Sequence, residues 1–396
     1  ASLRVRATAA LQPGESITLV VAAGYTEGAL EEVARALDQL STLAPARASV
    51  TNRIERERVS LRSPWGWLND DWTWALQQLD SLMVEAPAGL HTPLTGWAAD
   101  PDIAPRFKTG EAVVAGLAAL SAGDHDTAHQ LIEFLATTQN SSGEIAAGGK
   151  LTGTLEFTDH NAARQFLLLV AQYFAWTGEI GCVRRVWVHV RRAVASGQFN
   201  QVDAEGAAAV LRQLSQTAEA IGEREDGVAF KAHADQRVPG VSAQSQTPWQ
   251  SLWSIVEHDD EFTAGPGFAI APVIYGFCGA VPDAARNRIE LKTEIPLGWE
   301  FLELNNLRVG DNRFSFEYRR QGLSHSFRLR PLAGAVPLRV ILEPALFATG
   351  IRQVSVDGQD AQLDIRRVGN RWICPLQIVV DHDREIVIEA SDSEDA

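Results

Sequence analysis

Tryptophan is the residue whose abundance and spacing first suggest chemistry in this sequence, with eleven tryptophans against four tyrosines. The indole ring has a large, flat apolar face and one N–H donor, and such faces suit the C–H-rich faces of sugar rings. Trp97 is followed by Asp100 in a proline-containing segment, which adds a carboxylate to such a face. Trp72 and Trp249 lie in two further tryptophan groups. We interpret these four residues as candidate sugar-binding residues, with filling of a helical core as the alternative for each indole.

Acidic side chains are most concentrated in the segment Glu257-His258-Asp259-Asp260-Glu261. Carboxyl groups at such a position can exchange protons during catalysis, form a solvated helix end, or bind Ca²⁺ through their oxygens. The segment lacks the ligand spacing of a calcium loop, so we predict no metal site. The catalytic and the solvated alternatives stay open for Glu257 and Glu261.

Composition and charge exclude several classes of protein. The chain has 396 residues, of which 45% are hydrophobic and 21% charged, which is unlike a disordered or collagen-like chain. The formal net charge is −15 and the basic residues are scattered among acidic ones, which disfavours a nucleic-acid partner. No apolar run reaches the roughly 20 residues that a membrane span needs, so no membrane span is predicted.

Cysteine usage and short motifs predict neither a metal nor a cofactor. The three cysteines, Cys182, Cys278 and Cys374, are widely spaced, and we expect buried free thiols in a reducing compartment. No glycine-rich nucleotide-binding motif follows a strand, and no G-x-S-x-G elbow of a serine hydrolase is present. The start of the sequence shows no signal peptide. We therefore predict a cytoplasmic protein, and a periplasmic one stays open if a longer precursor is processed.

Hydrophobic periodicity divides the chain into three predicted parts. Residues 1–60 combine alternating apolar residues with a turn at Gln12–Glu15, which predicts a short β-hairpin followed by a helix. Residues 61–281 repeat apolar side chains at intervals of three and four, which predicts helices. The predicted helices are Gly66–Val84, Gly110–Ala122, Asp124–Gln139, Asp159–Thr177, Ile180–Ala195, Asp203–Ile221, Gly227–Gln236, Thr247–His258 and Gly267–Gly279. Alternating short and long loops are typical of paired antiparallel helices.

Residues 282–396 switch to alternation with a period of two. Phe314–Tyr318 and Ser326–Arg330 are examples, and Asp357-Gly358 and Gly369-Asn370 are typical hairpin turns. About eight strands at this spacing predict an antiparallel β-sandwich. The predicted fold class is therefore α+β with several domains: a short N-terminal β element, a domain of α/α-hairpins, and a C-terminal β-sandwich.

The order of these parts, together with several short motifs, resembles the six-hairpin (α/α toroid) glycosidases, which include the glycogen-debranching amylo-1,6-glucosidases. Residues 110–145 are similar to a helix pair of that family and the N-x-x-G-x-I-P loop after it. Phe157–Asn161 with Tyr173–Glu179 resembles its D-A-T…Y…T-G-D helix, and residues 202–207 resemble its V-E-I-N-A-L stretch. The resemblance covers residues 55–330 and implies that the helical hairpins form a toroid.

The resemblance also implies roles for particular residues. An aspartate of the family matches Asp159, and Glu111 replaces an aspartate that grips the sugar. His160 and Glu156 are adjacent candidates for substrate binding, and Glu257–Glu261 is where an acid or base is expected. The implied activity is inverting hydrolysis of α-glucosidic or related links in an oligosaccharide or polysaccharide. A plain helix cap is the alternative for Asp159, and complementarity to the helix dipole is the alternative for Glu111.

Departures from the family pattern keep other hypotheses open. Gly110 replaces the arginine that precedes the sugar-gripping aspartate, and no Asp or Glu lies between Glu179 and Asp203, where debranching enzymes carry their general acid. The predicted helices are too few for six hairpins, so an open or shortened ring is an alternative. A degenerate toroid that binds a glycan, or serves a protein partner as a structural or regulatory subunit, is therefore the second hypothesis. A lyase or epimerase is the third, which the shortage of tyrosine disfavours.

Overall fold

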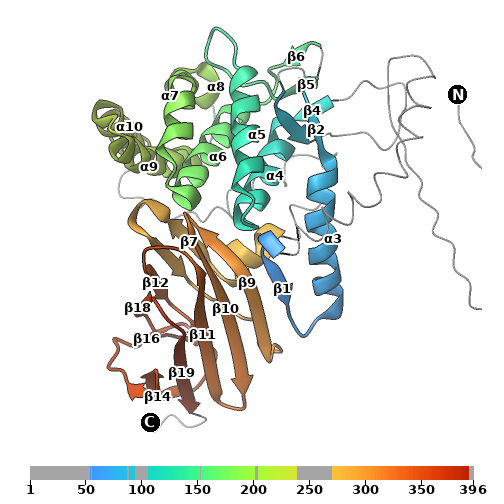
Figure 1. Cartoon of the computed structure of the whole chain (residues 1–396). Coiled ribbons are helices and arrows are strands. Elements are labelled where there is room, and N and C mark those ends of the chain that lie inside the picture. The colour runs from blue at the N-terminus through green and yellow to red at the C-terminus, as the bar shows by residue number, and fades with distance from the viewer. Residues whose placement is uncertain are drawn as a thin grey trace, which may run out of the picture. The chain divides into compact units, whose positions relative to one another are not determined.

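The computed structural model of this chain describes residues 54, 56–86, 89–93, 106–151, 153–200, 204–238 and 270–391 (Figure 1). Several predictions fall outside these residues. They are the hairpin and helix of residues 1–53, the helix Thr247–His258, and the candidate site residues Trp97, Asp100, Trp249, Glu257 and Glu261. Residues 55–396 form one compact unit, and the predicted domain boundary between residues 281 and 282 stays a prediction.

Three largely buried helices lie next to one another: α4 (Thr109–Ser121), α6 (Ala162–Thr177) and α9 (Ala204–Ile221). Helix α6 contacts both α4 and α9. The α4 helix approaches α6 closely at Gly116, where an added Cβ would lie 2.7 Å from Leu169 Cδ1. We call α4, α6 and α9 the inner helices.

Each inner helix is followed by an outer helix, namely α5 (His125–Thr137), α7 (Ile180–Ala195) or α10 (Arg224–Arg237). The turns contain Gly123, Gly178 and Gly222, all with positive φ, a conformation that glycine adopts without strain. Each outer helix contacts the inner helix before it. The predicted helical hairpins are therefore confirmed as α4/α5, α6/α7 and α9/α10 within the described residues. Closure of the hairpins into a toroid stays a prediction.

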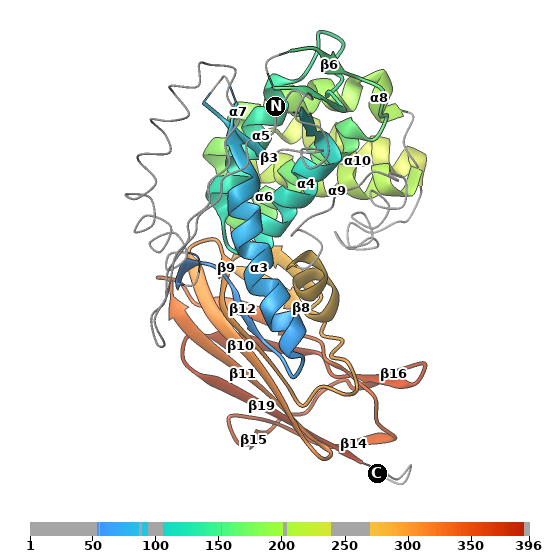
Figure 2. The ribbon, with the colours of Figure 1, turned by 90° about the vertical axis from the view of Figure 1, so that its right-hand side faces the viewer.

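The inner helices α4 and α6 have their carboxyl ends on the side of the helical layer that faces the β region, and their amino ends on the opposite side (Figure 1 and Figure 2). At the carboxyl ends, the Val59 N–H donates to Ala122 O at 2.9 Å, and the Gly310 N–H donates to Trp176 O at 2.7 Å. These bonds join the helices to the β region. At the amino ends lies a small antiparallel sheet, whose strands are β4 (Arg106–Lys108), β5 (Gly148–Lys150) and β6 (Leu155–Glu156).

Helix α3 (Gly66–Leu82) buries Trp72 and the aliphatic side chains on the same face. It ends two residues before the predicted Val84, because β2 (Met83–Glu85) pairs with β3 (His91–Pro93). The remaining short helices are α8 (Gly197–Asn200), the π-helix η1 (Pro272–Phe277) and the 3₁₀-helix η2 (Ala284–Arg286). Among the described residues, no helix is both long and apolar enough to cross a membrane.

A seven-stranded sheet forms most of the β region, with the order β1-β9-β10-β11-β19-β14-β15. Its strands are β1 (Ser60–Arg62), β9 (Phe301–Val309), β10 (Asn312–Gln321), β11 (Ser324–Ala333), β14 (Gly350–Val356), β15 (Gln359–Asp360) and β19 (Arg384–Ser391). All its pairs are antiparallel. Phe314, Phe316 and Tyr318 are buried at alternate positions of β10, which confirms the predicted period of two.

Two smaller sheets complete the β region. One has the order β18-β12-β8-β7 and the other β13-β17-β16. Their strands are β7 (Ala280–Asp283), β8 (Arg288–Leu291), β12 (Leu338–Leu342), β13 (Ala345–Leu346), β16 (Arg366–Val368), β17 (Arg371–Ile373) and β18 (Leu376–Val380). The β8–β12 pair is parallel, although purely antiparallel pairing was expected. The α+β class with antiparallel sheet is confirmed, and the packing of the sheets as a sandwich stays a prediction.

The strand β1 comes before the helices in the sequence but pairs with β9, which comes after them. Ser60 stands opposite Asn305, and Arg62 stands opposite Glu303. An ion pair of 3.1 Å between the Arg62 and Glu303 side chains accompanies the backbone bonds. The β region is therefore not formed by residues after 281 alone.

Candidate functional site

The small sheet β4–β5–β6 brings the start of α4 and the segment before α6 to one place. Helix α4 begins directly after β4, so Glu111 lies in its first turn. Strand β6 ends at Glu156, just before Asp159 in the sequence. Since β5 pairs with both β4 and β6, Glu111 and Asp159 lie at the same end of the inner helices. We call this candidate site the amino-terminal end.

Gln198 in α8 ties two segments of this end together. Its Nε2 donates to the carbonyl oxygens of Ile145, at 3.0 Å, and Asp159, at 2.7 Å. Its Oε1 accepts the Ile145 N–H at 3.0 Å. The side chain is 2% exposed, so these bonds replace bonds to water. Gln198 therefore fixes the backbone at Asp159. Sequence reasoning missed it, because a single glutamine after a helix carries no recognisable signal.

Asp159 lies before the helix and not at its cap, because α6 begins at Ala162 and its N-cap residue is Asn161. Its Oδ1 accepts the Asn161 N–H at 2.8 Å. The Asp159 side chain is half-buried, and the neighbouring His160 is exposed. The predicted N-cap at Asp159 is therefore displaced to Asn161, and the Asp159 carboxylate stabilises the turn that leads into the helix. It still lies near the amino-terminal end of the helix, where negative charge complements the helix dipole.

Glu111 is half-buried, while Ala112 and Val113 after it are fully buried. The carboxylate thus stands at the boundary between the apolar packing of α4 and the loops beyond the amino-terminal end. Negative charge in the first turn of a helix also complements the helix dipole. The geometry is compatible with both interpretations of this residue, the substrate-binding one and the purely structural one.

Two further polar side chains of the first turn of α6 are buried, although sequence reasoning did not single them out. Arg164 is 6% exposed and Gln165 is 3% exposed. Gln165 Oε1 is buried and has no hydrogen-bond partner in the described part of the chain. An unpartnered buried acceptor costs about 1–3 kcal/mol, so such a position is typical of a site that a ligand or water completes. The sequence does contain a sign of these two residues, because Arg164 and Gln165 are polar residues at the start of an otherwise apolar helix.

Comparison with solved structures identifies proteins that share this fold. The chain is similar to an α-L-rhamnosidase from Dictyoglumus thermophilum, with a TM-score of 0.59 and 8% identity over 84% of this chain and 50% of that one. It is also similar to a Streptomyces avermitilis α-L-rhamnosidase complexed with L-rhamnose, with a TM-score of 0.50 and 8% identity over 84% and 42% of the two chains. The chain has the fold of these proteins. At this identity the likeness concerns the fold alone.

A human-microbiome protein described as a kojibiose phosphorylase gives a TM-score of 0.50 and 8% identity, over 89% of this chain and 68% of that one. No protein-family model matches this sequence, and no curated protein matches it either. The chain spans about half the length of the rhamnosidases. The expected likeness to six-hairpin glycosidases is therefore supported at the level of the fold.

Glu156 forms an ion pair with Arg106 across the small sheet. Both side chains are partly exposed, so the pair contributes little to stability and can open to solvent. Among the described residues, no group of three or more His, Cys, Asp or Glu side chains could hold a metal ion.

Trp72 is 1% exposed, and its Nε1 donates to Val59 O at 2.9 Å. A sugar could reach this ring only if the packing around α3 opened. The exposed indoles of this region are those of Trp65, Trp67 and Trp74, which are 41%, 60% and 54% exposed. The structure therefore brings together Glu111, Glu156, Asp159 and His160 at the amino-terminal end and places Trp72 in the core.

Proposed function

We propose that this chain is part of a glycoside-processing protein whose active site lies at the amino-terminal end of the inner helices. The observation that carries the proposal is the placement of two carboxylates, those of Glu111 and Asp159, at one end of two adjacent helices. Such an end offers carboxylates for proton transfer. The solved structures with this fold include two that act on, or bind, rhamnose by name.

The proposed reaction is inverting cleavage of an α-glucosidic or related linkage, as in the debranching glucosidases. One carboxyl group protonates the departing oxygen, and a second activates a water molecule on the opposite face of the sugar. We assign Asp159 and Glu111 to the site and expect the proton donor from Glu257 or Glu261. A pair of carboxyl groups about 6.5–9.5 Å apart is the separation that this mechanism needs.

The second candidate is a degenerate relative that binds a glycan, or supports a protein partner, without cleaving the sugar. Two described carboxylates favour it, because Asp159 accepts a hydrogen bond from its own turn and Glu156 is paired with Arg106. A carboxylate held in such contacts is less available for proton transfer. The absence of acidic residues between Glu179 and Asp203 in the sequence points the same way.

Turnover assays separate the two candidates. Aryl α-glucosides, aryl α-L-rhamnosides and α-linked glucans are incubated with the protein, with and without inorganic phosphate, and released sugar is measured. For an enzyme we expect Asp159→Asn and Glu111→Gln to lower kcat about 100-fold or more. Asp126→Asn is the matched control, because Asp126 is exposed in the first turn of α5 at the other end of the helical layer.

Binding to glucans by calorimetry without turnover on any substrate would overturn the enzymatic proposal in favour of the glycan-binding one. Turnover that survives both substitutions would overturn the assigned site. A protein that neither binds nor cleaves any of these sugars would contradict both candidates.

A further inference from the structure

Three exposed tryptophans lie in the first half of helix α3, which starts beside the β region (Figure 2). Trp65 is the N-cap residue of the helix, and Trp67 and Trp74 lie within it. Trp67 and Trp74 are each more than half exposed. They are seven residues apart, so both lie on one face of the helix, about 10 Å apart along its axis. Filling of the core, which explains the buried Trp72, does not explain these rings.

Aromatic contacts hold the first of these rings against the β region. The rings of Trp65 and Trp67 stack with their centroids 5.4 Å apart. Trp65 also contacts Trp299 edge to face, with centroids 5.1 Å apart. Trp299 is buried and contacts Phe277 at 5.3 Å. One face of the Trp67 ring therefore rests on Trp65, and the other face is open to solvent.

Hydrogen bonds fix the backbone that carries these rings. The Ser63 N–H donates to Asn69 Oδ1 at 2.8 Å, and Asn69 Nδ2 donates back to Ser63 O at 3.0 Å. The Leu68 N–H donates to Trp65 O at 3.1 Å. The start of α3 is therefore ordered before any ligand arrives, which lowers the entropic cost of binding.

Two carboxylates lie between the exposed rings. Asp70 and Asp71 follow Trp67 by three and four residues, so they share its face of the helix with Trp74. Both are exposed, and neither side chain bonds to any residue in the described part of the chain. Their oxygens are therefore available to accept hydrogen bonds from hydroxyl groups. We call Trp67, Asp70, Asp71 and Trp74 the α3 face.

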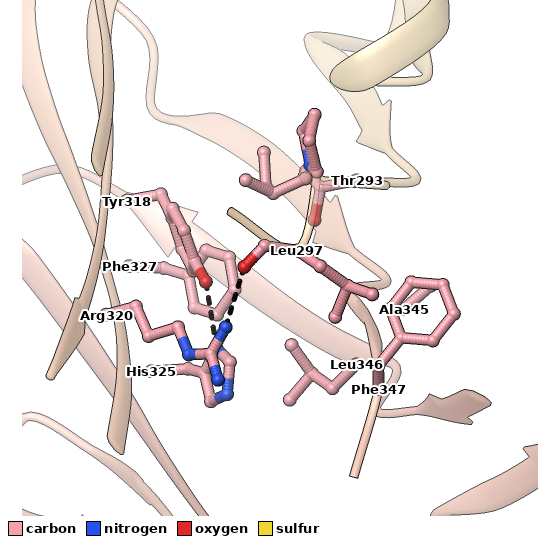
Figure 3. Close-up of a pocket in the computed structure, with 11 residues that line it drawn as sticks. Thr293, Leu297, Tyr318, Arg320, His325, Phe327, Ala345, Leu346 and Phe347 are labelled. Carbon is pink, nitrogen blue, oxygen red and sulfur yellow. Dashed lines mark hydrogen bonds between the residues drawn. The ribbon is translucent and has the colours of Figure 1, made fainter. Parts of the chain in front are cut away.

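The small pocket in the β region does not offer an alternative, enclosed site (Figure 3). Its cavity volume is about 20 Å³, which is room for about one water molecule. The Tyr318 hydroxyl and His325 Nδ1 bond to each other at 2.9 Å, and Arg320 Nη1 donates to Leu297 O at 2.8 Å. A sugar does not fit there, whereas the α3 face is open.

We propose that the α3 face binds a neutral polysaccharide or a long oligosaccharide. One sugar ring stacks its C–H face on the Trp67 indole and another stacks on Trp74. Asp70 and Asp71 accept hydrogen bonds from hydroxyl groups of the sugars between them. Because the two indoles are about 10 Å apart along the helix, a chain of sugars reaches both, whereas a monosaccharide reaches one.

A neutral glycan fits the α3 face better than a protein, a cation or an anion. A protein partner would bury both carboxylates at the centre of its interface, where charged residues are depleted. A cation is best bound between ring faces, but Trp67 and Trp74 are too far apart to enclose one, and Trp65 covers the inner face of Trp67. An anionic glycan or lipid would be repelled by Asp70 and Asp71.

This site is separate from the amino-terminal end and does not depend on the function proposed there. The contact of Trp65 with Trp299 places the α3 face beside the β region. Glu111 and Asp159 lie at the ends of the inner helices that point away from the β region (Figure 1). A polysaccharide held on the α3 face is therefore bound without contact to these two carboxylates.

Affinity gel electrophoresis and calorimetry of the full chain test the proposal, with amylose, mixed-linkage β-glucan, galactomannan and the anionic polygalacturonate as probes. We expect binding of at least one of the three neutral polysaccharides. Trp67→Ala and Trp74→Ala should each raise its Kd about tenfold, because each removes one stacking surface. Asp70→Asn combined with Asp71→Asn should raise it by a smaller factor, since an amide keeps one acceptor oxygen. Val188→Ala is the matched control, because Val188 is an exposed apolar residue of α7.

Two further measurements keep the result free of other causes. Trp67→Ala also loses the contact with Trp65, so the thermal unfolding midpoint of each variant is measured. Trp74 has no ring contact with any described residue, so a weaker affinity of Trp74→Ala reports on the ligand alone. The experiment measures binding only, so an absence of turnover at the amino-terminal end does not affect it.

Equal affinities of the wild type, Trp67→Ala and Trp74→Ala would overturn the proposal. Absence of binding to every neutral polysaccharide, or tighter binding of polygalacturonate, would overturn it as well. Loss of binding in Glu111→Gln with wild-type affinity in both tryptophan variants would assign the glycan to the amino-terminal end instead. Sedimentation velocity detects a second copy seated on the α3 face. Self-association that both tryptophan variants abolish, without polysaccharide binding by the wild type, would also contradict the proposal.

Discussion

Gly116 in α4 lies directly against Leu169 in α6, and this contact sets the distance between two inner helices. A Cβ at Gly116 would lie 2.7 Å from Leu169 Cδ1 and 3.0 Å from Cδ2. Leu169 is fully buried, so its side chain has little space to move. The absence of a side chain at residue 116 therefore allows α4 and α6 to pack closely against each other.

The first prediction concerns this contact. Gly116→Val should lower the free energy of unfolding by about 1–3 kcal/mol, because the added methyl groups overpack a closed core. Gly181→Val is the matched control, since Gly181 is also helical but exposed, with only the Glu179 side chain near its Cβ position. Urea unfolding measures both variants. An equal effect at the two positions would contradict the prediction.

Gln198→Leu should destabilise the fold by about 2–4 kcal/mol, because the Ile145 N–H and two buried carbonyl oxygens lose their partner. It should also reduce glycan binding, if the amino-terminal end is the site, since Asp159 is no longer fixed. Urea unfolding and calorimetry are the measurements. Gln236→Leu is the control, because Gln236 is an exposed glutamine of α10. A Gln198 variant as stable as this control would refute the positioning role.

The stability should fall as the pH is lowered, partly because of His125. Burial, followed by the charges of Arg308 and Arg313, lowers the pKa of this histidine to about 3 in the folded protein. The unfolded chain binds the proton near pH 6.5, so protonation favours unfolding as pH falls from 6.5 towards 3. The loss from one such group is about 1.4 kcal/mol per pH unit. The free energy of unfolding measured at several pH values should show a shallower slope for His125→Gln than for the wild type.

Trp176 Nε1 donates to the Tyr275 hydroxyl at 2.8 Å, and both side chains are buried. Tyr275→Phe leaves the indole N–H without a partner and should cost about 1–3 kcal/mol. In a double-mutant cycle, Trp176→Phe should cost less when it is added to Tyr275→Phe than when it is made in the wild type. Thermal unfolding of the four proteins measures the coupling. Strictly additive effects would show that the bond contributes nothing.

Local patterns in the sequence predicted the elements whose faces repeat regularly. Apolar residues of α6 recur at intervals of three and four, and the predicted range 159–177 is close to the observed Ala162–Thr177. Alternation in Phe314–Tyr318 predicted only the middle of β10, which runs from Asn312 to Gln321. The cap of α6 was misplaced from Asn161 to Asp159, because either residue can cap a helix and only the backbone conformation distinguishes them. Within the predicted helix Gly267–Gly279, periodicity could not distinguish the π-helix η1 from an α-helix.

Contacts between distant parts of the chain could not be predicted from such patterns. The pairing of Ser60–Arg62 with residues 303–305 and the parallel pair of β8 and β12 have no local signature. The buried amides of Gln165 and Gln198 were missed for a related reason, since a polar residue does not reveal from its type that it is buried. The carboxylates Glu111 and Asp159 were predicted from the resemblance alone, and their role in a site stays a prediction.

Strand β1 has a consequence for any attempt to divide this protein. A fragment that starts after the helices would present the unprotected backbone of β9 along one side of its largest sheet. Free edges of this kind recruit strands from neighbouring molecules, so the isolated fragment should self-associate. Because Ser60–Arg62 covers the edge of β9, the strands after the helices need a segment that comes before the helices, and the two parts cannot be separated without exposing that edge.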